Sequence, residues 1–294
     1  MNEFELIDEI VRILGDVAEG AVIGPGDDGS ALRPPAGEVL VSSIDCLVSG
    51  VHFPAEAPGE LVGYRAMMVS LSDLAAMGAT PAQVLVGLTL EESDRQWALD
   101  LATGLRAAAL ATGAKLLGGN LARGPRNITL SVNGFCPEDQ LLTRAGASVG
   151  DGIFVTGKLG AASAAVAQNR LADLSDPLTE RYFRPRARID VGLLLRDVAT
   201  STIDVSDGLL QDMSHICDSS TVGAELQSSA IPVAEGAALE HALHGGDDYE
   251  LLFTASRKLP DLDTTVYRIG TVVAASGIRL DGKPVSIAGY QHFL

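Results

Sequence analysis

The chain has 294 residues, of which 47% are hydrophobic and 20% charged, so it can bury a substantial core and lacks the composition of a disordered protein. Asp and Glu number 38 against 21 Lys and Arg, a formal net charge of −17. Such a surplus repels nucleic-acid backbones and anionic membrane surfaces, so we expect neither as a partner. The 3 cysteines form no C-x-x-C pair, which indicates reduced thiols. The start of the chain is acidic and amphipathic, unlike a signal peptide, and no apolar run approaches the ~20 residues of a membrane span. We therefore expect a cytoplasmic protein.

The first half of the chain alternates helix and strand patterns. The pattern predicts a helix over residues 1–16, a short strand at 21–23, a loop at 24–29 and a strand at 38–48. A helix then runs from Pro58 toward a stopping glycine at Gly78, and a strand follows at 82–90. A long helix ending near residues 111–114 precedes two further strands, 115–120 and 127–136. This half is predicted to be an α/β domain.

Turn-rich sequence around residues 137–152 indicates a domain boundary. We place the N-terminal domain at residues 1–137 and the C-terminal domain at 148–294. In the second domain the predicted strands are 152–157, 201–205, 223–227 and 249–255, followed by a β-rich end. Helices are predicted at 161–170, 187–199 and 208–220, with another before the last of those strands. The fold class expected is α/β and α+β in two domains.

The loop G-P-G-D-D-G at residues 24–29 has the lettering G-x-G-x-x-G of a dinucleotide-binding turn, with Asp45 near the position of a ribose ligand. In that motif the third glycine opens a helix whose N-terminus carries the pyrophosphate. Two consecutive prolines soon after the loop leave no room for this helix, and Asp27 and Asp28 would repel phosphate. The sequence argues against a nicotinamide or flavin site.

Other aspartates stand on apolar elements or beside glycines, where a solvated surface would not place them. Asp45 interrupts a strand, and Asp73 lies in a helix so apolar that an unpaired carboxylate there would be costly. The others are Asp28, Asp204, Asp207, Asp247 and Asp248. Taken singly, Asp207 is more simply explained as a helix cap and Asp28 as a turn residue. Together they indicate Mg²⁺ ions that let carboxylates reach phosphate, and hence metal-assisted phosphoryl chemistry.

Several motifs resemble, in order along nearly the whole chain, those of the thiamine-monophosphate kinase family. They are GPGDDGSAL, SIDCLVSGVHF, SLSDLAAMGATP, LLGGNLARG, LTRAGASVGD, VTGKLGAASA, IDVSDGLLQDMSHI, GGDDYELLFT and GYQHF. The resemblance implies the two-domain fold of aminoimidazole ribonucleotide synthetase, in which the N-terminal domain binds metal and ATP and forms a β-barrel across a homodimer. The C-terminal domain would cover the active-site cleft.

The resemblance also implies the reaction and its reagents. ATP and thiamine monophosphate would give thiamine diphosphate and ADP by direct transfer of the γ-phosphoryl group, with several Mg²⁺ ions. Because both substrates are polyanions in an acidic protein, metal ions are needed to offset their mutual repulsion. The expected partners are these two substrates and a second copy of the chain, without nucleic acid or membrane.

Residue roles follow from the same resemblance. The implied metal ligands are Asp28, Ser43, Ile44 (through its backbone carbonyl), Asp45, Asp73, Asn120, Asp204 and Asp207, of which Asp28, Asp73 and Asp207 would be catalytic. Gly118, Gly119, Arg144 and Ser206 would contact ATP, and His52, Asp247 and Tyr290 the thiamine substrate. Arg144 offers a planar donor fork suited to phosphate.

The chain departs from the family pattern at four of its motif positions. Asn120 stands where the family has Asp, Ile44 where it has Thr, Ala161 where it has Asp, and Asp247 where it has Glu. Two alternatives to the kinase therefore stay open. One is a weakly active or inactive nucleotide-binding relative that acts as a sensor or scaffold. The other is a different ATP-dependent enzyme of the same superfamily.

Overall fold

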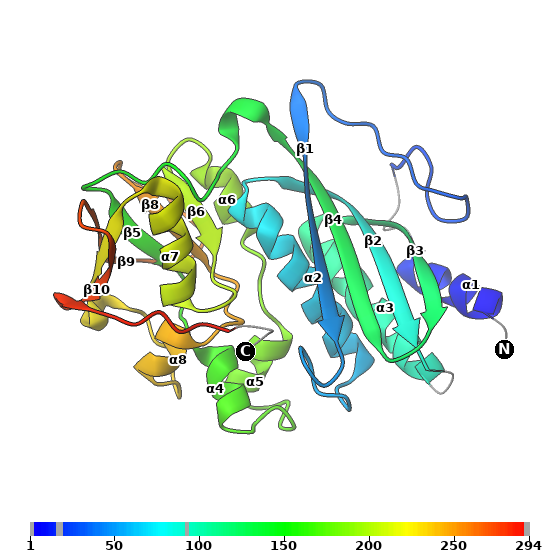
Figure 1. Cartoon of the computed structure of the whole chain (residues 1–294). Helices are drawn as coiled ribbons and strands as arrows, with labels where there is room; N and C mark the ends of the chain where they lie inside the picture. The colour runs from blue at the N-terminus through cyan, green and yellow to red at the C-terminus, as the bar shows by residue number, and fades with distance from the viewer. Residues whose placement is uncertain (1–2, 16–19, 92–93, 291–294) are drawn as a thin grey trace. The chain divides into compact units, whose positions relative to one another are not determined.

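The computed structural model describes residues 3–15, 20–91 and 94–290. The chain forms two compact units (Figure 1). Unit 1 extends to Leu74 and includes Ala79–Glu138, and unit 2 comprises Ala75–Gly78 and the chain from Asp139 onward. Within the described ranges, no helix is both long enough and apolar enough to cross a membrane.

Unit 1 is built on a four-stranded sheet with the strand order β1-β4-β2-β3. Strand β4 pairs antiparallel with both β1 and β2, while β2 and β3 are parallel. Its described elements are α1 (Glu3–Leu14), β1 (Glu38–Val48), α2 (Gly59–Ala76), β2 (Thr80–Leu90), α3 (Arg95–Thr112), β3 (Lys115–Arg123) and β4 (Asn127–Pro137). The parallel β2–α3–β3 connection passes through a helix, as a parallel pair requires.

The two faces of this sheet differ in what covers them. Helices α2 and α3 lie on one face, which we call the helix face (Figure 1). Every second residue of β4 is buried there, with Ile128, Leu130 and Val132 each at 0% exposure. On the opposite face, which we call the open face, Ser42 Oγ donates to Asn133 Oδ1 at 2.6 Å. Because side chains alternate along a strand, neighbouring residues of one motif are divided between these faces.

Helices α2 and α3 approach so closely that their contact requires glycine. A Cβ atom on Gly104 of α3 would lie 1.9 Å from the carbonyl oxygen of Glu60 in α2. A Cβ on Gly63 of α2 would lie 2.2 Å from the carbonyl oxygen of Leu101. Small residues thus bring the two backbones together.

One N-terminal expectation differs from the structure, and a second, the barrel across a homodimer, is not tested by a single chain. The strand expected at residues 21–23 is an isolated bridge between Ile23 and Ala31, because the glycines and prolines that follow cannot continue a ladder. The sheet of unit 1 is open, with β1 and β3 at its edges, and no closed barrel forms among the described strands. The expected barrel would require a second chain.

Unit 2 contains a seven-stranded mixed sheet with the order β11-β10-β7-β9-β5-β8-β6. Its strands are β5 (Gly152–Thr156), β6 (Ser201–Asp204), β7 (Gly223–Leu226), β8 (Leu251–Ala255), β9 (Val266–Val273), β10 (Gly277–Leu280) and β11 (Lys283–Pro284). Its α-helices are α4 (Ala161–Ala167), α5 (Pro177–Phe183), α6 (Ile189–Leu195), α7 (Leu209–Ser220) and α8 (Leu239–His244). Short 3₁₀ turns lie at Glu138–Gln140 and Ser228–Ala230.

Helix α5 is absent from the sequence-based prediction although its start carries a clear signal. Asp176 caps it by accepting hydrogen bonds from the amides of Leu178 and Thr179, and Pro177 occupies its first position. The helix has only 7 residues, too few to show a full apolar period.

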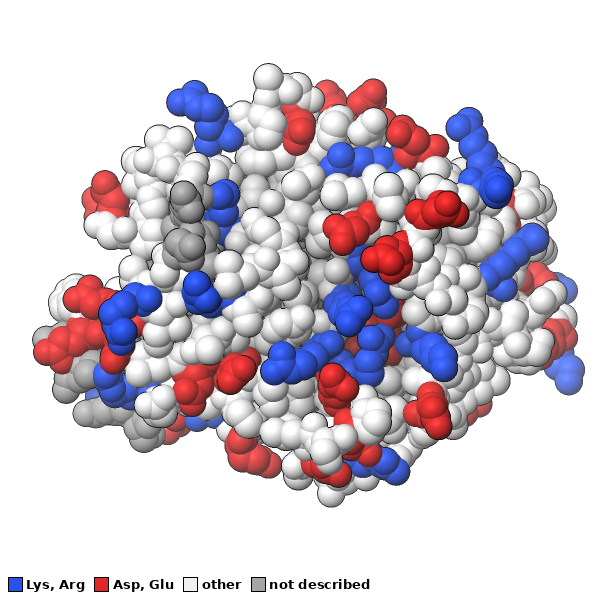
Figure 2. Space-filling view, turned by 180° about the vertical axis from the view of Figure 1, so that it is seen from behind, with Lys and Arg blue, Asp and Glu red and all other residues white. Residues whose placement is uncertain are grey.

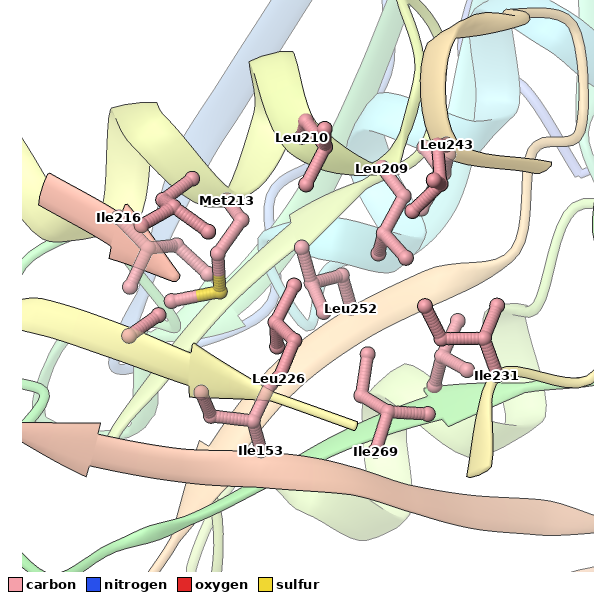
Figure 3. Close-up of a cluster of buried hydrophobic side chains, with 14 of the residues drawn as sticks. Ile153, Leu209, Leu210, Met213, Ile216, Leu226, Ile231, Leu243, Leu252 and Ile269 are labelled. Carbon is pink, nitrogen blue, oxygen red and sulfur yellow. The ribbon is translucent and has the colours of Figure 1, made fainter. Parts of the chain in front are cut away.

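The core of unit 2 lies between α7 and one face of its sheet (Figure 3). Leu209, Met213 and Ile216 of α7 have 0% exposure and pack with Ile153, Leu252 and Ile269 of the sheet. This packing holds the N-terminal end of α7 at the end of strand β6, where two of the predicted site aspartates lie.

On one face of the molecule the acidic side chains are dispersed and do not gather in one patch (Figure 2). Figure 2 shows acidic side chains scattered over one face, with a group of basic side chains close together near its middle. Dispersed charge of this kind contributes mainly to solubility. The exposed carboxylates therefore do not by themselves locate a functional site.

Candidate active site

Ser43, Asp45 and Asp73 come together on the helix face of unit 1. Ser43 and Asp45 are alternate residues of β1 and point toward α2, which carries Asp73. Ser43 Oγ donates a short hydrogen bond of 2.5 Å to Asp73 Oδ2. Three residues that the sequence predicted as metal ligands therefore form one oxygen-rich cluster, which we call the β1–α2 cluster.

The electrostatics of this cluster favour a cation. Burial, the charge of Asp73 and, in the opposite direction, a hydrogen bond from Ser70 combine to raise the pKa of Asp45 to about 6. A carboxyl group with a raised pKa beside a second carboxylate is stabilised in its ionised form by a positive charge. Ser70 also faces this cluster; sequence reasoning missed it, although it lies three residues before Asp73 on the same helix.

The donor atoms suit Mg²⁺, which prefers hard oxygen ligands and usually takes one or two carboxylates together with substrate phosphates. Two carboxylates and one hydroxyl meet that description. Among the described residues no group of three or more His, Cys, Asp or Glu side chains forms a complete metal cage. The cluster fits a metal ion that is shared with a phosphate ligand.

The loop that carries Asp28 lies toward the other face of the sheet. Asp27 and Asp28 are exposed, and Asp27 Oδ1 accepts the amide of Asp28 at 2.8 Å. In the same loop Ser30 Oγ accepts from Gln83 Nε2 at 3.0 Å, and Gln83 pairs with Asn133 of the open face. The described part of this chain thus does not bring Asp28 to the β1–α2 cluster.

Ile44, Gly118, Gly119 and Asn120 also lie apart from that cluster. The side chain of Ile44 points to the open face and is 66% exposed, so only its backbone could serve the cluster. Strands β1 and β3 are opposite edges of the sheet, separated by three spacings of about 4.8 Å, or roughly 14 Å. Asn120 pairs with Gly87, whose other neighbour Thr129 belongs to the open face.

His52 lies in the loop after β1, and its ring is oriented by the strand. Its Nδ1 accepts a hydrogen bond of 3.0 Å from the amide of Val48. The neutral ring then carries its proton on Nε2, which leaves that nitrogen as a donor. This geometry suits a residue that contacts a hydrogen-bond acceptor on a ligand.

In unit 2 the predicted residues gather on the turn after β6. Asp204 ends the strand, and Ser206 and Asp207 lie in the turn that leads into α7. The amide of Asp247 donates to the Ser206 carbonyl at 2.9 Å, and the amide of Tyr290 donates to the Asp207 carbonyl at 3.2 Å. We call residues 204–208 the aspartate turn; it unites residues separated by more than 80 positions in the sequence.

The segment that carries Asp247 is strained. Asp247 and Tyr249 have φ angles of 70° and 52°, the left-handed region that side chains rarely occupy. A Cβ on Gly246 would lie 2.1 Å from the Ser206 carbonyl oxygen, so this segment touches the aspartate turn backbone to backbone. The hydroxyl of Tyr249 donates to Asp247 Oδ1 at 2.9 Å and orients that carboxylate. Strain that the surroundings maintain is typical of functional segments.

A buried ion cluster anchors the far end of the same segment. Glu250 is 1% exposed and accepts hydrogen bonds from Arg188 at 2.6 Å to each oxygen, from Arg181 at 2.8 Å and from Thr156 at 2.6 Å. Asp248 accepts the amide of Gly160 at 2.9 Å, and burial raises the pKa of Asp248 well above its ordinary value. These contacts hold the strained segment in place. The sequence selected Asp248 as a candidate site carboxylate, but it did not predict Glu250 or its arginine partners as part of the site.

Asp212 supports the aspartate turn from α7 and was also missed. It is 1% exposed, and burial together with the charges of Asp204 and Asp207 raises the pKa of Asp212 to about 8. The sequence did contain a feature that could have identified Asp212: it is an acidic residue on the apolar side of an amphipathic helix, between Leu209 and Ile216.

The main chain of Arg144 lies at the end of α7 that is far from this turn. The Arg144 carbonyl accepts from Ser220 Oγ at 3.3 Å, at the end of α7 opposite to Ser206. Helix α7 spans 12 residues, about 18 Å, so the backbones of Arg144 and Ser206 lie at opposite ends of it. Ala161 is buried at the first position of α4.

Sequence profiles of known families match most of this chain. Residues 26–136 match the family "AIR synthase related protein, N-terminal domain", and residues 148–283 match "AIR synthase related protein, C-terminal domain". Apart from the last residue of β4 and of β11, the unit 1 sheet and the unit 2 sheet each fall within one of these matches.

Relatives that match over their full length identify the family more specifically. The thiamine-monophosphate kinase of Escherichia coli (strain K12) is 40% identical over 99% of this chain and 98% of its own length. The crystal structure of thiamine-monophosphate kinase from Stenotrophomonas maltophilia K279a superimposes with a TM-score of 0.88 at 36% identity, covering 97% of this chain and 98% of that one. The structure of AaThiL complexed with AMPPCP and TMP gives a TM-score of 0.83 at 30% identity, covering 99% and 97% of the two chains. The chain thus belongs to the thiamine-monophosphate kinase family, with the two-domain fold of the AIR synthase related proteins.

Proposed function

We propose that this protein transfers the γ-phosphoryl group of ATP to thiamine monophosphate, giving thiamine diphosphate and ADP. The observation that carries this proposal is 40% identity over 99% of the chain to a thiamine-monophosphate kinase. The structure with AMPPCP and TMP bound adds support, because a relative of nearly equal length holds an ATP analogue and TMP together.

In the proposed reaction a phosphate oxygen of thiamine monophosphate attacks the γ-phosphorus of ATP, and the bond between that phosphorus and the β–γ bridging oxygen breaks. The electron pair of the broken bond stays with ADP. Because the acceptor phosphate is already ionised, the protein needs little proton transfer and contributes mainly alignment and charge stabilisation. Bound Mg²⁺ would supply positive charge at the phosphate oxygens.

The β1–α2 cluster is the proposed Mg²⁺ site of unit 1. Asp45 and Asp73 provide the negative charge, and Ser43 provides a neutral oxygen while holding Asp73 in place. Gly118 and Gly119 lie on an edge strand, where phosphate can reach the backbone. Asp28 and Asn120 remain proposed metal ligands.

The aspartate turn is the proposed metal and ligand site of unit 2. Asp204 and Asp207 would add metal-binding carboxylates, and Ser206 and Arg144 would contact ATP. Asp247, Tyr290 and, in unit 1, His52 are proposed to contact the thiamine substrate. The hydrogen bonds from the amides of Asp247 and Tyr290 to the turn support a common role for these residues.

The proposal is tested by a coupled assay of the purified protein with Mg-ATP. We expect ADP release that depends on thiamine monophosphate, together with an equal amount of thiamine diphosphate. Chelation of Mg²⁺ should abolish both products. Nucleotide binding without turnover would instead favour the sensor or scaffold alternative that Asn120 and Ala161 suggest.

We also expect this protein to act in the cytoplasm.

We also propose that the chain forms a homodimer through the open face and the β1 edge of unit 1. Leu40 and Ile44 are 61% and 66% exposed on this face, and both belong to the edge strand β1, whose outer hydrogen-bonding groups can pair with another strand. We expect light scattering to give twice the chain mass of 30.5 kDa. Leu40→Lys should weaken association, whereas Leu110→Lys, at an exposed apolar residue of α3, should not. A wild-type protein of single-chain mass would contradict the proposal.

A further inference from the structure

We propose that Asp212 is a positioning residue that sets the conformation of the aspartate turn and thereby aligns both the metal-binding carboxylates and the acceptor-binding residues. This inference rests on the proposed function, because it concerns how the same site is held. Asp212 would touch neither substrate nor the reacting phosphate. Its effect would pass through the backbone of residues 206–208.

A single side chain, that of Asp212, accepts the hydrogen bonds on the inner side of the aspartate turn. Asp212 Oδ2 accepts hydrogen bonds from three successive backbone amides, those of Ser206, Asp207 and Gly208, at 3.1, 3.2 and 3.2 Å. The carboxylate is 1% exposed, so water does not compete for these bonds. One oxygen of Asp212 therefore fixes the orientation of three peptide groups in a row.

Fixing the amides on one side also fixes the carbonyls on the other. The carbonyl oxygens of Val205, Ser206 and Asp207 accept from the amides of Tyr249, Asp247 and Tyr290 at 2.9, 2.9 and 3.2 Å. The last two donors are the proposed acceptor-binding residues. The turn is thus hydrogen-bonded to Asp212 on one side and, on the other, to the segments proposed to bind the acceptor. Asp207, whose side chain is a proposed metal ligand, lies in the middle of this turn.

A carboxyl group suits this role better than an amide side chain. Metal ions bound at Asp204 and Asp207 would favour the ionised form of Asp212, whose oxygen accepts hydrogen bonds from amides more strongly than a neutral oxygen does. An asparagine at the same position keeps the shape and one acceptor oxygen, but it holds the three amides less firmly. A residue that only stabilised the start of α7 would affect unfolding without changing how the turn aligns its ligands.

The test compares Asp212→Asn with Asp218→Asn, which removes the same charge from an exposed position on the same helix. For Asp212→Asn we expect kcat to fall by roughly 10–100-fold, the loss typical when a group that orients metal ligands is changed. We also expect KM for thiamine monophosphate and the Mg²⁺ concentration at half-maximal rate to rise. Asp218→Asn should match the wild type in all three.

A second readout uses metal-free protein without substrate. Hydrogen exchange should show slow amides at residues 206–208 in the wild type and roughly tenfold faster exchange there in Asp212→Asn, while the β5 and β9 amides stay unchanged. This readout tests the positioning role even if the wild type shows no phosphoryl transfer, which would sink the proposed function alone. Fast exchange at residues 206–208 in the wild type would overturn the inference, whether or not the variant folds. So would an Asp212→Asn enzyme with wild-type kinetics, or equal losses in Asp218→Asn.

Discussion

Asp73→Asn is expected to lower kcat by about 100-fold or more while the protein stays folded. Asn has nearly the shape of Asp, and its amide oxygen can still accept the hydrogen bond from Ser43 that the carboxylate accepts at 2.5 Å. The change therefore removes a negative charge from the β1–α2 cluster and little else. Turnover with Mg-ATP and thiamine monophosphate measures the effect.

The effect of the Asp73 charge on its neighbour Asp45 can be measured without an activity assay. In the metal-free protein, burial and the charge of Asp73 both raise the pKa of Asp45, which stands at about 6. Removing that charge should lower the pKa of Asp45 toward its ordinary value of 3.8. A titration of the Asp45 carboxyl group followed by NMR would show the downward shift.

Asp8→Asn provides the matched control for this prediction. Asp8 is an exposed carboxylate on α1 of the same unit, so the variant makes the same chemical change away from the cluster. We expect wild-type turnover and an unchanged pKa of Asp45. If Asp73→Asn also turned over at the wild-type rate, Asp73 would not belong to the active site.

Arg188→Ala is expected to lower the free energy of unfolding of unit 2 by about 3 kcal/mol, because it leaves the buried carboxylate of Glu250 without its main partner. Arg188 contacts both oxygens of Glu250 at 2.6 Å and is 12% exposed. Arg181 would remain, but its side chain is 35% exposed and makes one contact of 2.8 Å. The midpoint of thermal unfolding should fall by roughly 6–12 °C.

Two further variants separate the loss of pairing from the loss of packing. Arg186→Ala, at an exposed arginine of the same segment, should leave the unfolding midpoint nearly unchanged. Adding Glu250→Gln to Arg188→Ala should recover part of the loss, because the unpaired buried charge is then gone. A double variant less stable than Arg188→Ala alone would contradict this explanation.

The stabilising effect of the Arg188–Glu250 pair should depend on pH, in a direction that follows from the pKa of Glu250. Burial alone would raise the pKa of Glu250, but the hydrogen bonds and charge of Arg188, with Thr156 and Arg181, hold it below its ordinary value of 4.5. A carboxyl group with a lowered pKa in the folded state stabilises the fold above that ordinary value and loses this contribution as pH falls below it. The difference between wild type and Arg188→Ala should therefore be full at neutral pH and shrink below about pH 4.5.

Patterns within single elements were predictable from the sequence. Strands β1 and β4 alternate in hydrophobicity, and α3 ends at Gly113 with a φ of 75°, as a stopping glycine should. Family motifs, each of them local in sequence, gave the family and the reaction class. Asp45 and Asp73 could be selected as candidates because each is a carboxylate on an otherwise apolar element.

The sequence did not predict which neighbouring residues of a motif lie together in the folded protein. Ser43, Ile44 and Asp45 are consecutive, yet the alternation of β1 sends Ile44 to the open face and its neighbours toward α2. Asn120 follows Gly119 in a motif typical of metal and phosphate binding, but β3 is the edge strand opposite to β1. A strand order that is not the order of the chain cannot be read from spacing.

By itself, the sequence determined the types of element and the family, and it selected acidic residues as candidate metal ligands, because each of these depends on local pattern or on short motifs. Only the tertiary structure decided which of those residues meet. It joined Ser43 to Asp73, and it placed Asp247 and Tyr290 on the aspartate turn through backbone hydrogen bonds that leave no trace in residue type. It also brought Asp212 beneath three amides, because the packing of α7 on its sheet fixes where that one carboxylate points.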